Sequence, residues 1–170
     1  MKTSYIFITL SLLALQMKAQ KFSTQNGGHC YTLDIPNYLM KTYDLNDNAT
    51  LQYQNIVKEA YTIVIEDSKE ELKYVGMLFL NPKEFLESFI SEYQIDMSNR
   101  SVSKIKEFTE NNNKHAQLEI TWTDEEIDFF MIVTTVETNT HFYKILCWTT
   151  DQYKNVLKED YLNISKSLKD

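Results

Sequence analysis

The fold is decided by one stretch of the sequence, residues 115–149, which reads HAQLEITWTDEEIDFFMIVTTVETNTHFYKILCWT. Three runs rich in β-branched and aromatic residues follow one another in it, at 115–123, 127–136 and 142–149, and each is typical of a β-strand. The polar links between the runs are short, and links of this length require antiparallel neighbours. The middle run is almost wholly apolar, as expected of a central strand that is covered on both faces. These residues therefore predict an antiparallel meander.

Further strands are expected on the N-terminal side of the meander. Tyr31, Leu33 and Ile35 alternate with polar residues, and the run 61–66 is β-branched, so both patterns indicate extended chain. The expected additional strands are 31–35, a short one within 38–44, one that begins near Leu51, 61–66 and 102–108.

A helix is expected over residues 81–97. Asn81 can cap it, the following proline suits the first helical position, and Glu84 can return a hydrogen bond to the cap. Leu80 and Phe85 stand where a hydrophobic staple would join them. The apolar stripe, expected to face the core, consists of Phe85, Leu86, Phe89, Ile90 and Tyr93.

A second helix with one apolar face is expected over residues 151–168, and the spacing of Ser68 and Glu71 favours a short helical turn. The chain shows no internal repeat and no linker. The predicted fold class is α+β: a single-domain α/β/α sandwich, in which helices flank an antiparallel sheet of six to seven strands.

The N-terminus has the pattern of an export signal. Lys2 precedes an apolar run over residues 5–15, and Ala19 offers a cleavage site. The apolar run is short for a bilayer span, so residues 1–19 are predicted to be a cleaved signal peptide, with an uncleaved anchor as the alternative. Residues 20–30 are expected to be a flexible lead-in, and 31–170 one domain of an exported protein, periplasmic or secreted, without a transmembrane span after cleavage.

The charge of the chain is strongly negative. The formal net charge is −7, and removal of residues 1–19 leaves 15 basic against 24 acidic residues, a net charge of −9. Because an acidic surface repels phosphate groups, nucleic acids and anionic membranes are poor partners for it. The separate expectation of a protein partner in the cell envelope rests on the missing catalytic motifs and on the family resemblance described below, and the protein is expected to be a monomer.

The two cysteines allow two interpretations. In an oxidising compartment Cys30 and Cys147 could form a disulfide. Alternatively they are separate thiols, with Cys147 buried in its strand as a small apolar side chain.

Motifs for catalysis or cofactor binding are missing from the sequence. It has no nucleophile elbow, phosphate loop, dinucleotide fingerprint, Cys-x-x-Cys or His-Glu-x-x-His. Asp44, Asn46 and Asn48 match the start of a calcium loop, but the Gly and the final Glu that such a loop needs are lacking. An Asx-rich turn explains these residues. No catalytic residue, metal ligand or cofactor is therefore assigned.

One acidic group is the remaining candidate for a binding surface. It lies at a predicted hairpin tip and could be a partner patch or a solvated turn. Its residues are Asp124, Glu125, Glu126 and Asp128.

The order of the elements resembles that of the PsbP-like proteins over roughly residues 31–168. The opening Tyr31-Thr-Leu-Asp-Ile-Pro36 and the ending Phe142-Tyr-Lys-Ile-Leu-Cys-Trp-Thr149, followed by an amphipathic helix, carry the resemblance. It implies an α/β/α sandwich and a non-enzymatic, protein-binding role, since the family includes an extrinsic photosystem II subunit, Ran-binding Mog proteins and exported bacterial proteins. The expected function is a non-catalytic binding or accessory domain. The alternative is a small-ligand carrier or hydrolase with a site in a sheet–helix cleft.

Overall fold

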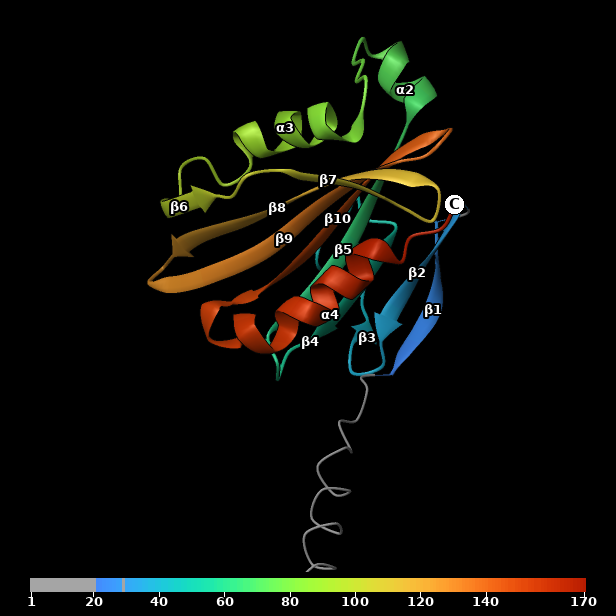
Figure 1. The fold of residues 1–170 in the computed structure, drawn as a ribbon. Helices are drawn as coiled ribbons and strands as arrows, with labels where there is room; N and C mark the ends of the chain where they lie inside the picture. Colours follow the sequence, from blue (N-terminus) through green and yellow to red (C-terminus); the bar gives the residue numbers. More distant parts are fainter. Residues whose placement is uncertain (1–20, 29) are drawn as a thin grey trace, which may run out of the picture.

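The computed structural model describes residues 21–28 and 30–170 (Figure 1). The predicted signal peptide, residues 1–19, lies outside these residues. Among the residues that are described, no helix has the length and apolar character needed to cross a membrane.

An antiparallel sheet of eight strands, counted within the described residues, forms the middle layer. Its strand order is β3-β4-β5-β10-β9-β8-β6, and β7 pairs with β8 beyond the end of β6. The central pairs are the consecutive hairpins of the meander, so the prediction made from residues 115–149 is confirmed. The strands are β3 (Met40–Lys41), β4 (Leu51–Asn55), β5 (Ala60–Ser68), β6 (Ser98–Val102), β7 (Lys106–Glu110), β8 (Asn113–Asp124), β9 (Ile127–Glu137) and β10 (His141–Thr150).

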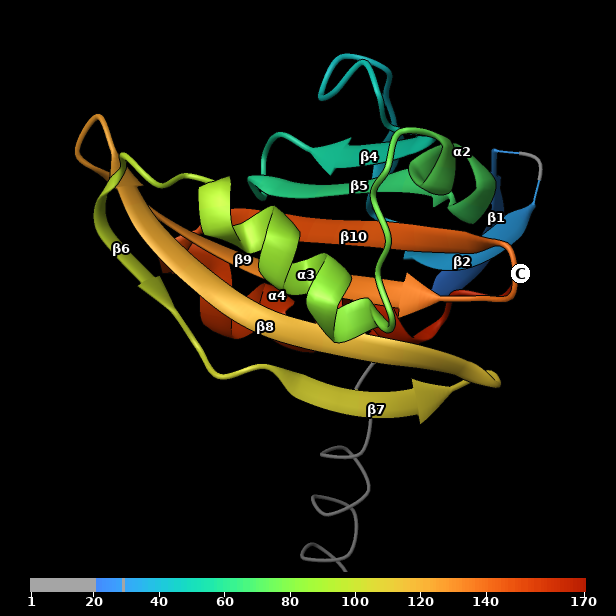
Figure 2. The same cartoon turned by 90° about the horizontal axis from the view of Figure 1, so that it is seen from above.

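Each face of the sheet is covered by a different layer. Helix α4 (Lys154–Lys166), preceded by the 3₁₀ turn η1 (Asp151–Tyr153), lies on one face together with a two-stranded hairpin of β1 (Phe22–Gly27) and β2 (Tyr31–Pro36). Helix α3 (Pro82–Glu92) lies on the other face, and the short helix α2 (Lys69–Tyr74) follows β5 at the sheet end (Figure 2). The predicted α+β class and α/β/α sandwich are confirmed.

Two apolar cores lie on the two faces of the sheet, and a smaller cluster of Leu72, Phe85 and Phe142 lies near α2. On β9, Phe130 and Ile132 belong to the core under α4, while Met131 and Val133 belong to the core under α3. Successive side chains of a strand point to opposite faces, so a central strand covered on both sides is mostly apolar; in β9 the buried exceptions are Thr134 and Thr135. This coverage on both sides is why residues 129–133 carry no polar side chain.

Several predicted boundaries are wrong. The lead-in 20–30 contains β1, whose six residues pair with β2, so most of it is a strand. The predicted strand 102–108 is two strands, β6 and β7, that pair with different parts of β8. The short strand within 38–44 is confined to β3, and the sheet has eight strands instead of six or seven.

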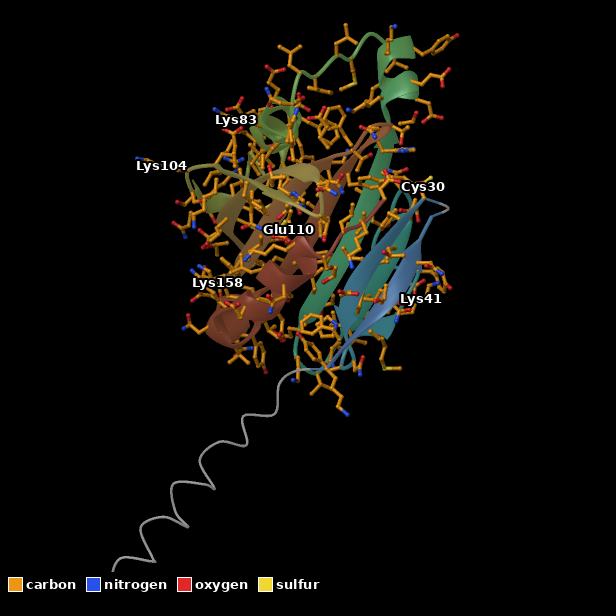
Figure 3. All side chains as sticks on the ribbon, turned by 45° about the vertical axis from the view of Figure 1, so that its right-hand side comes forward. Cys30, Lys41, Lys83, Lys104, Glu110 and Lys158 are labelled. Atoms are coloured by element: carbon orange, nitrogen blue, oxygen red, sulfur yellow. The ribbon has the colours of Figure 1, made fainter. Side chains whose placement is uncertain are left out.

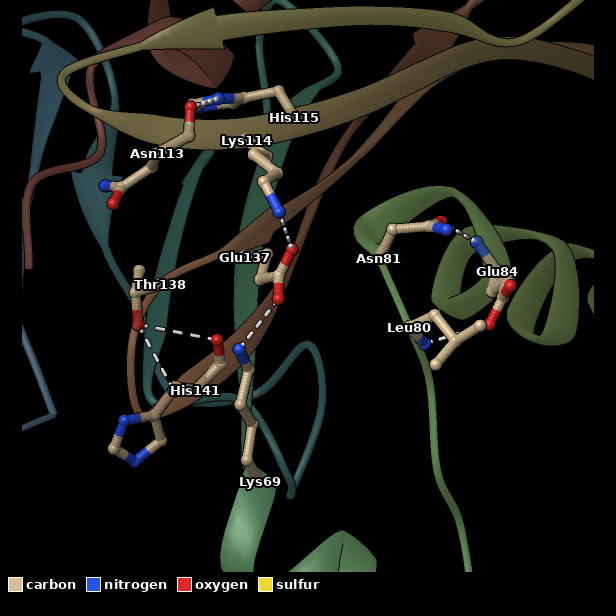
Figure 4. Close-up of polar contacts among 10 residues, drawn as sticks. All are labelled: Lys69, Leu80, Asn81, Glu84, Asn113, Lys114, His115, Glu137, Thr138 and His141. Atoms are coloured by element: carbon tan, nitrogen blue, oxygen red, sulfur yellow. Dashed lines mark hydrogen bonds and ion pairs between the residues drawn. The ribbon is translucent and has the colours of Figure 1, made fainter.

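Helix α3 begins as predicted, but the staple does not form. Asn81 Oδ1 accepts a hydrogen bond from Glu84 N, and Glu84 Oε2 accepts one from Leu80 N, both at 2.9 Å (Figure 4). Leu80 is 80% exposed, and Phe85 packs instead against Phe79, with ring centroids 5.0 Å apart. The hydrophobic residue that fixes the helix entry is therefore Phe79, one position earlier.

Helix α3 also ends earlier than expected, at Glu92, because Tyr93 adopts an extended conformation and Gln94 a left-handed one. The Arg100 side chain caps the C-terminal end of α3, because its guanidinium donates hydrogen bonds to the carbonyl oxygens of Ile90 and Tyr93 at 2.5 and 3.0 Å. A cation at this position also interacts favourably with the helix dipole.

The two hairpin tips beside β8 have the same backbone geometry. Asn111 and Asn112 have positive φ angles, and so do Glu125 and Glu126. Two left-handed residues between antiparallel strands form a type I′ turn, which favours Asn and Gly. The asparagines suit their turn, whereas the two glutamates occupy backbone conformations that side chains with a Cβ rarely adopt.

The last residues of the chain are held against the rest of the domain. Thr32 and Lys169 exchange backbone hydrogen bonds of 2.8 and 3.1 Å, and the Ser167 hydroxyl accepts from Asp34 N at 2.9 Å. The side-chain amide of Asn111 donates to the carbonyl oxygens of Lys166 and Leu168. Residues that follow α4 are therefore part of the packed layer that covers the sheet.

Candidate functional site

The acidic residues expected at a hairpin tip do meet there, at the turn between β8 and β9. Asp124, Glu125, Glu126 and Asp128 are all exposed. Asp128 Oδ1 accepts a 2.6 Å hydrogen bond from the Thr123 hydroxyl. The structure thus gathers four carboxylates on a protruding tip.

The two cysteines are both free thiols, which corresponds to the second of the two interpretations. Cys30 is exposed at the end of the β1–β2 hairpin (Figure 3). Cys147 is buried within β10. The Thr62 hydroxyl lies 3.6 Å from Cys147 Sγ. Burial raises the pKa of the Cys147 thiol to about 12, so this side chain is an inert apolar group at neutral pH.

The segment with a partial calcium motif is an ordinary turn. Asn46 Oδ1 accepts a 2.9 Å hydrogen bond from Asn48 N, which is the geometry of an Asx turn. The Gln52 side chain then holds the same loop through the backbone of Leu45 and Asn46. Within residues 21–28 and 30–170 there is no group of three or more His, Cys, Asp or Glu side chains that could hold a metal ion.

The most prominent surface feature is one that the sequence analysis missed, the segment that joins α2 to α3. Residues 74–80 read YVGMLFL and carry no charge. Tyr74 is 92% exposed and Leu80 80% exposed, and Val75 and Leu78 also point into solvent. The signal that could have indicated this segment is a short apolar run whose residues repeat with neither the helical nor the strand period. We call residues 74–80 the apolar strap. Contiguous exposed apolar side chains are characteristic of interaction surfaces.

A groove of about 400 Å³ lies between the apolar strap and α3, and we call it the α3 groove. In Figure 2 the strap crosses above β5 and β10 and then turns into α3, so that strap and helix form two sides. The groove is lined by Met77, Phe79, Phe85, Ser88, Phe89, Glu92, Tyr93 and Lys144.

The floor of the α3 groove holds an ion pair. Lys144 Nζ donates to Asp67 Oδ2 at 2.6 Å, and the two side chains are only 14% and 26% exposed. The same ammonium group lies 4.9 Å from the centroid of the Phe85 ring and 5.9 Å from that of Phe89. Removing either partner would leave a half-buried charge unpaired, so this lysine is a fixed and neutralised part of the floor.

Aromatic packing fixes the rest of the groove. The rings of Phe85 and Phe142 stack with centroids 4.9 Å apart, and Phe79 meets both of them edge to face. At the other end, Phe89 packs on Tyr93 with centroids 4.9 Å apart. Phe89 packs against the core under α3, as expected of a member of the apolar stripe, but it is only partly buried there and also lines the groove. Leu86 is the fully buried member of the stripe.

A second, polar hollow lies beside Lys69, the first residue of α2. Glu137 accepts hydrogen bonds from Lys69 at 2.8 Å and from Lys114 at 3.4 Å (Figure 4). Asparagines of the β7–β8 turn line the same hollow. Its charges compensate one another within the protein.

The α3 groove has few polar side chains. Its polar side chains are Ser88, Glu92 and the paired Lys144. Neither His nor Cys lies among the groove residues, so Ser88 has no imidazole or thiol partner in the groove that could activate it. Partly exposed apolar rings beside a few polar groups can instead recognise an apolar side chain.

Comparison with known proteins shows what this fold is similar to. No family model matches the sequence, and no curated protein matches it. PsbP (CyanoP) from Synechocystis sp. PCC 6803 superposes with a TM-score of 0.60 and 10% sequence identity, covering 91% of this chain and 95% of that chain. LpqN from Mycobacterium tuberculosis, a protein involved in cell envelope biogenesis, gives 0.59 and 9% identity, covering 91% and 93%.

A protein of unknown function from Pseudomonas aeruginosa gives a TM-score of 0.50 with 10% identity, over 83% of this chain and 91% of that one. At such low identity these similarities show the fold alone. The PsbP-like fold expected from the order of the elements is confirmed.

Proposed function

We propose that the protein is an exported, non-catalytic accessory domain that binds a protein partner in the cell envelope. The observation that carries this proposal is the apolar strap, where four side chains between Tyr74 and Leu80 are each more than half exposed beside an open groove. Exposing this much apolar surface costs solubility unless a partner covers it. The export signal in residues 1–19 and the envelope role of LpqN support the location.

The acidic hairpin has a separate role in this proposal. Asp124, Glu125, Glu126 and Asp128 act as a steering patch for a basic partner, because exposed charge speeds encounter more than it adds affinity. The apolar strap then supplies the contact area. We further propose that residues 31–170 form one PsbP-like domain that works as a monomer.

The volume of the α3 groove favours one alternative. About 400 Å³ lies within the range of sites for small molecules. A carrier for a small apolar ligand would bind in the same groove, but Tyr74 and Leu78 do not line that groove and would have no part in the binding.

Site-specific photo-crosslinking in the producing cell tests the main proposal. A photo-reactive residue at Leu78 is expected to capture one envelope protein, whereas the same residue at Val156, a similarly exposed position on α4, should capture none. Mass spectrometry of the purified native protein should show Gln20 as the N-terminus. Equal labelling from both positions, or an intact Met1 in the cytosol, would contradict the proposal.

A further inference from the structure

We propose that the α3 groove takes one short linear segment of the partner, which carries two apolar side chains and an adjacent Lys or Arg. This inference rests on the proposed function and specifies the chemistry of what binds at its site. Three properties of the groove support it: its apolar volume, its length and the charge of its rim.

The volume sets the number of side chains. A protein cavity of roughly 150 Å³ holds one benzene ring, and the α3 groove has about 400 Å³. Two ring-sized or aliphatic side chains therefore fit side by side. Phe79 and Phe85 offer apolar contact at one end and Phe89 and Tyr93 at the other.

The length sets the extent of the segment. From Phe85 to Tyr93 the helix rises by about 12 Å, at roughly 1.5 Å per residue. An extended chain covers about 3.3 Å per residue, so roughly four residues span the groove. In such a segment alternate side chains point the same way, which places two apolar side chains into the groove.

The charge of the rim selects a basic segment. Lys144 is neutralised by Asp67, and Lys69, the first residue of α2, is bound to Glu137. Among the described residues Glu92 lines the groove, is exposed and takes part in no ion pair. A Lys or Arg next to the apolar side chains would complete a charge pair with it.

The charged residues of the neighbouring helix α2 also favour a basic partner segment. Helix α2 presents Glu70 and Glu71, both exposed and outside the ion pairs of the described residues. Lys73 is the one basic residue there without an ion pair in that part of the chain, and it borders the smaller hollow on the far side of the strap. Because the Glu92 carboxylate at the groove and the exposed glutamates of α2 repel anionic lipid headgroups, a protein segment is favoured over a bilayer.

Peptide selection tests this inference. A random dodecapeptide display library is selected against the purified protein, and the most enriched peptide is measured by fluorescence anisotropy. We expect enriched peptides with two apolar residues within four positions and an adjacent Lys or Arg.

Matched variants on one helix locate the site. Ser88→Trp fills the groove, whereas Ser91→Trp places the same side chain at an exposed position outside it. We expect Ser88→Trp to lower the affinity for the peptide by about tenfold or more, equivalent to about 1.4 kcal/mol. Ser91→Trp should leave this affinity within about twofold of that of the wild type. Glu92→Lys should lower the affinity for the peptide about threefold, and its control Glu87→Lys should have little effect on this affinity.

Each outcome separates the inference from the proposed function. The inference is overturned, and protein binding is left intact, if the enriched peptides bind Ser88→Trp and Glu92→Lys as tightly as the wild type. The same conclusion follows if the enriched peptides carry acidic in place of basic residues. Failure to enrich any peptide also overturns the inference, and the crosslinks at Leu78 then decide the proposed function independently. Binding to vesicles of phosphatidylcholine and phosphatidylglycerol that depends on the strap would overturn both.

Discussion

The ring of Phe108 lies flat against the imidazole of His115, with centroids 4.8 Å apart and planes inclined by 16°. His115 is 1% exposed, and its Nδ1 donates to the Asn113 carbonyl oxygen at 3.1 Å. Its Nε2 is buried without a hydrogen-bond partner among the described residues. Burial lowers the pKa of His115, although the Asn113 carbonyl and Glu110 oppose this shift. The folded protein therefore favours the neutral form of the His115 imidazole over the protonated form.

Protonation of His115 should weaken the fold in mild acid. Since its pKa in the folded state lies below that of the unfolded chain, about 6.5, the unfolded state binds the proton more tightly. The contribution of neutral His115 to the free energy of unfolding is fully present above the pKa of the unfolded chain. It is lost as the pH falls through the pKa of His115 in the folded state. Urea unfolding at a series of pH values from 8 to 5 should show a steeper loss for the wild type than for His115→Phe. Parallel curves would show that His115 does not contribute.

The two thiols should differ in reactivity. Cys30 is exposed and Cys147 is buried with a raised pKa, so a maleimide should label one thiol per native chain and two in denaturant. Cys30→Ser should abolish native labelling, while the conservative Cys147→Ala should leave it unchanged. Absence of native labelling that reappears after reduction would instead show a disulfide.

The β8–β9 turn should be open to stabilisation. Glu125 and Glu126 both hold left-handed backbone angles, which cost roughly 1–2 kcal/mol per residue for side chains with a Cβ. The double substitution Glu125→Asn with Glu126→Gly should raise the free energy of unfolding by about 1 kcal/mol, because Asn followed by Gly suits a type I′ turn. The double change to Gln is the control for lost charge, because it keeps the backbone cost. Equal stabilisation by both pairs would assign the effect to charge repulsion.

The two faces of α3 should respond differently to truncation. Leu86 is fully buried, so Leu86→Ala should cost about 2–5 kcal/mol. Phe89 lies partly exposed at the α3 groove, and Phe89→Ala should therefore cost less, while weakening the peptide bound there. Unfolding in urea measures the first effect and anisotropy the second. A cost for Phe89→Ala as large as that for Leu86→Ala would place its ring in the core.

The sequence predicted those elements whose side chains alternate or repeat. The meander was readable because β8, β9 and β10 bury both faces, and α3 because Asn81 and Glu84 cap it. Strand β1 was missed because its side chains are mostly polar, and its pairing with β2 depends on backbone hydrogen bonds. Backbone pairing leaves no periodic signature in the sequence.

The proposed binding surface was harder to predict than the fold. The acidic tip was found because its carboxylates are adjacent in the sequence, but the α3 groove joins residues from the strap, α3 and β10. Lys144 is one polar residue within an apolar strand, and only the position of Asp67 on β5 explains it. A site of this kind is defined by strand order, which pairing between distant segments determines.

The contact between Thr32 and Lys169 has a consequence for how the chain reaches its native state. Strand β2 docks against residues that are synthesised almost 140 positions later, so this part of the molecule has a very long loop to close. Contacts of such separation slow folding. Strand β2 therefore stays unpaired on that side until the segment around Lys169 is present, and this contact adds a closure of long sequence separation to the folding of the domain.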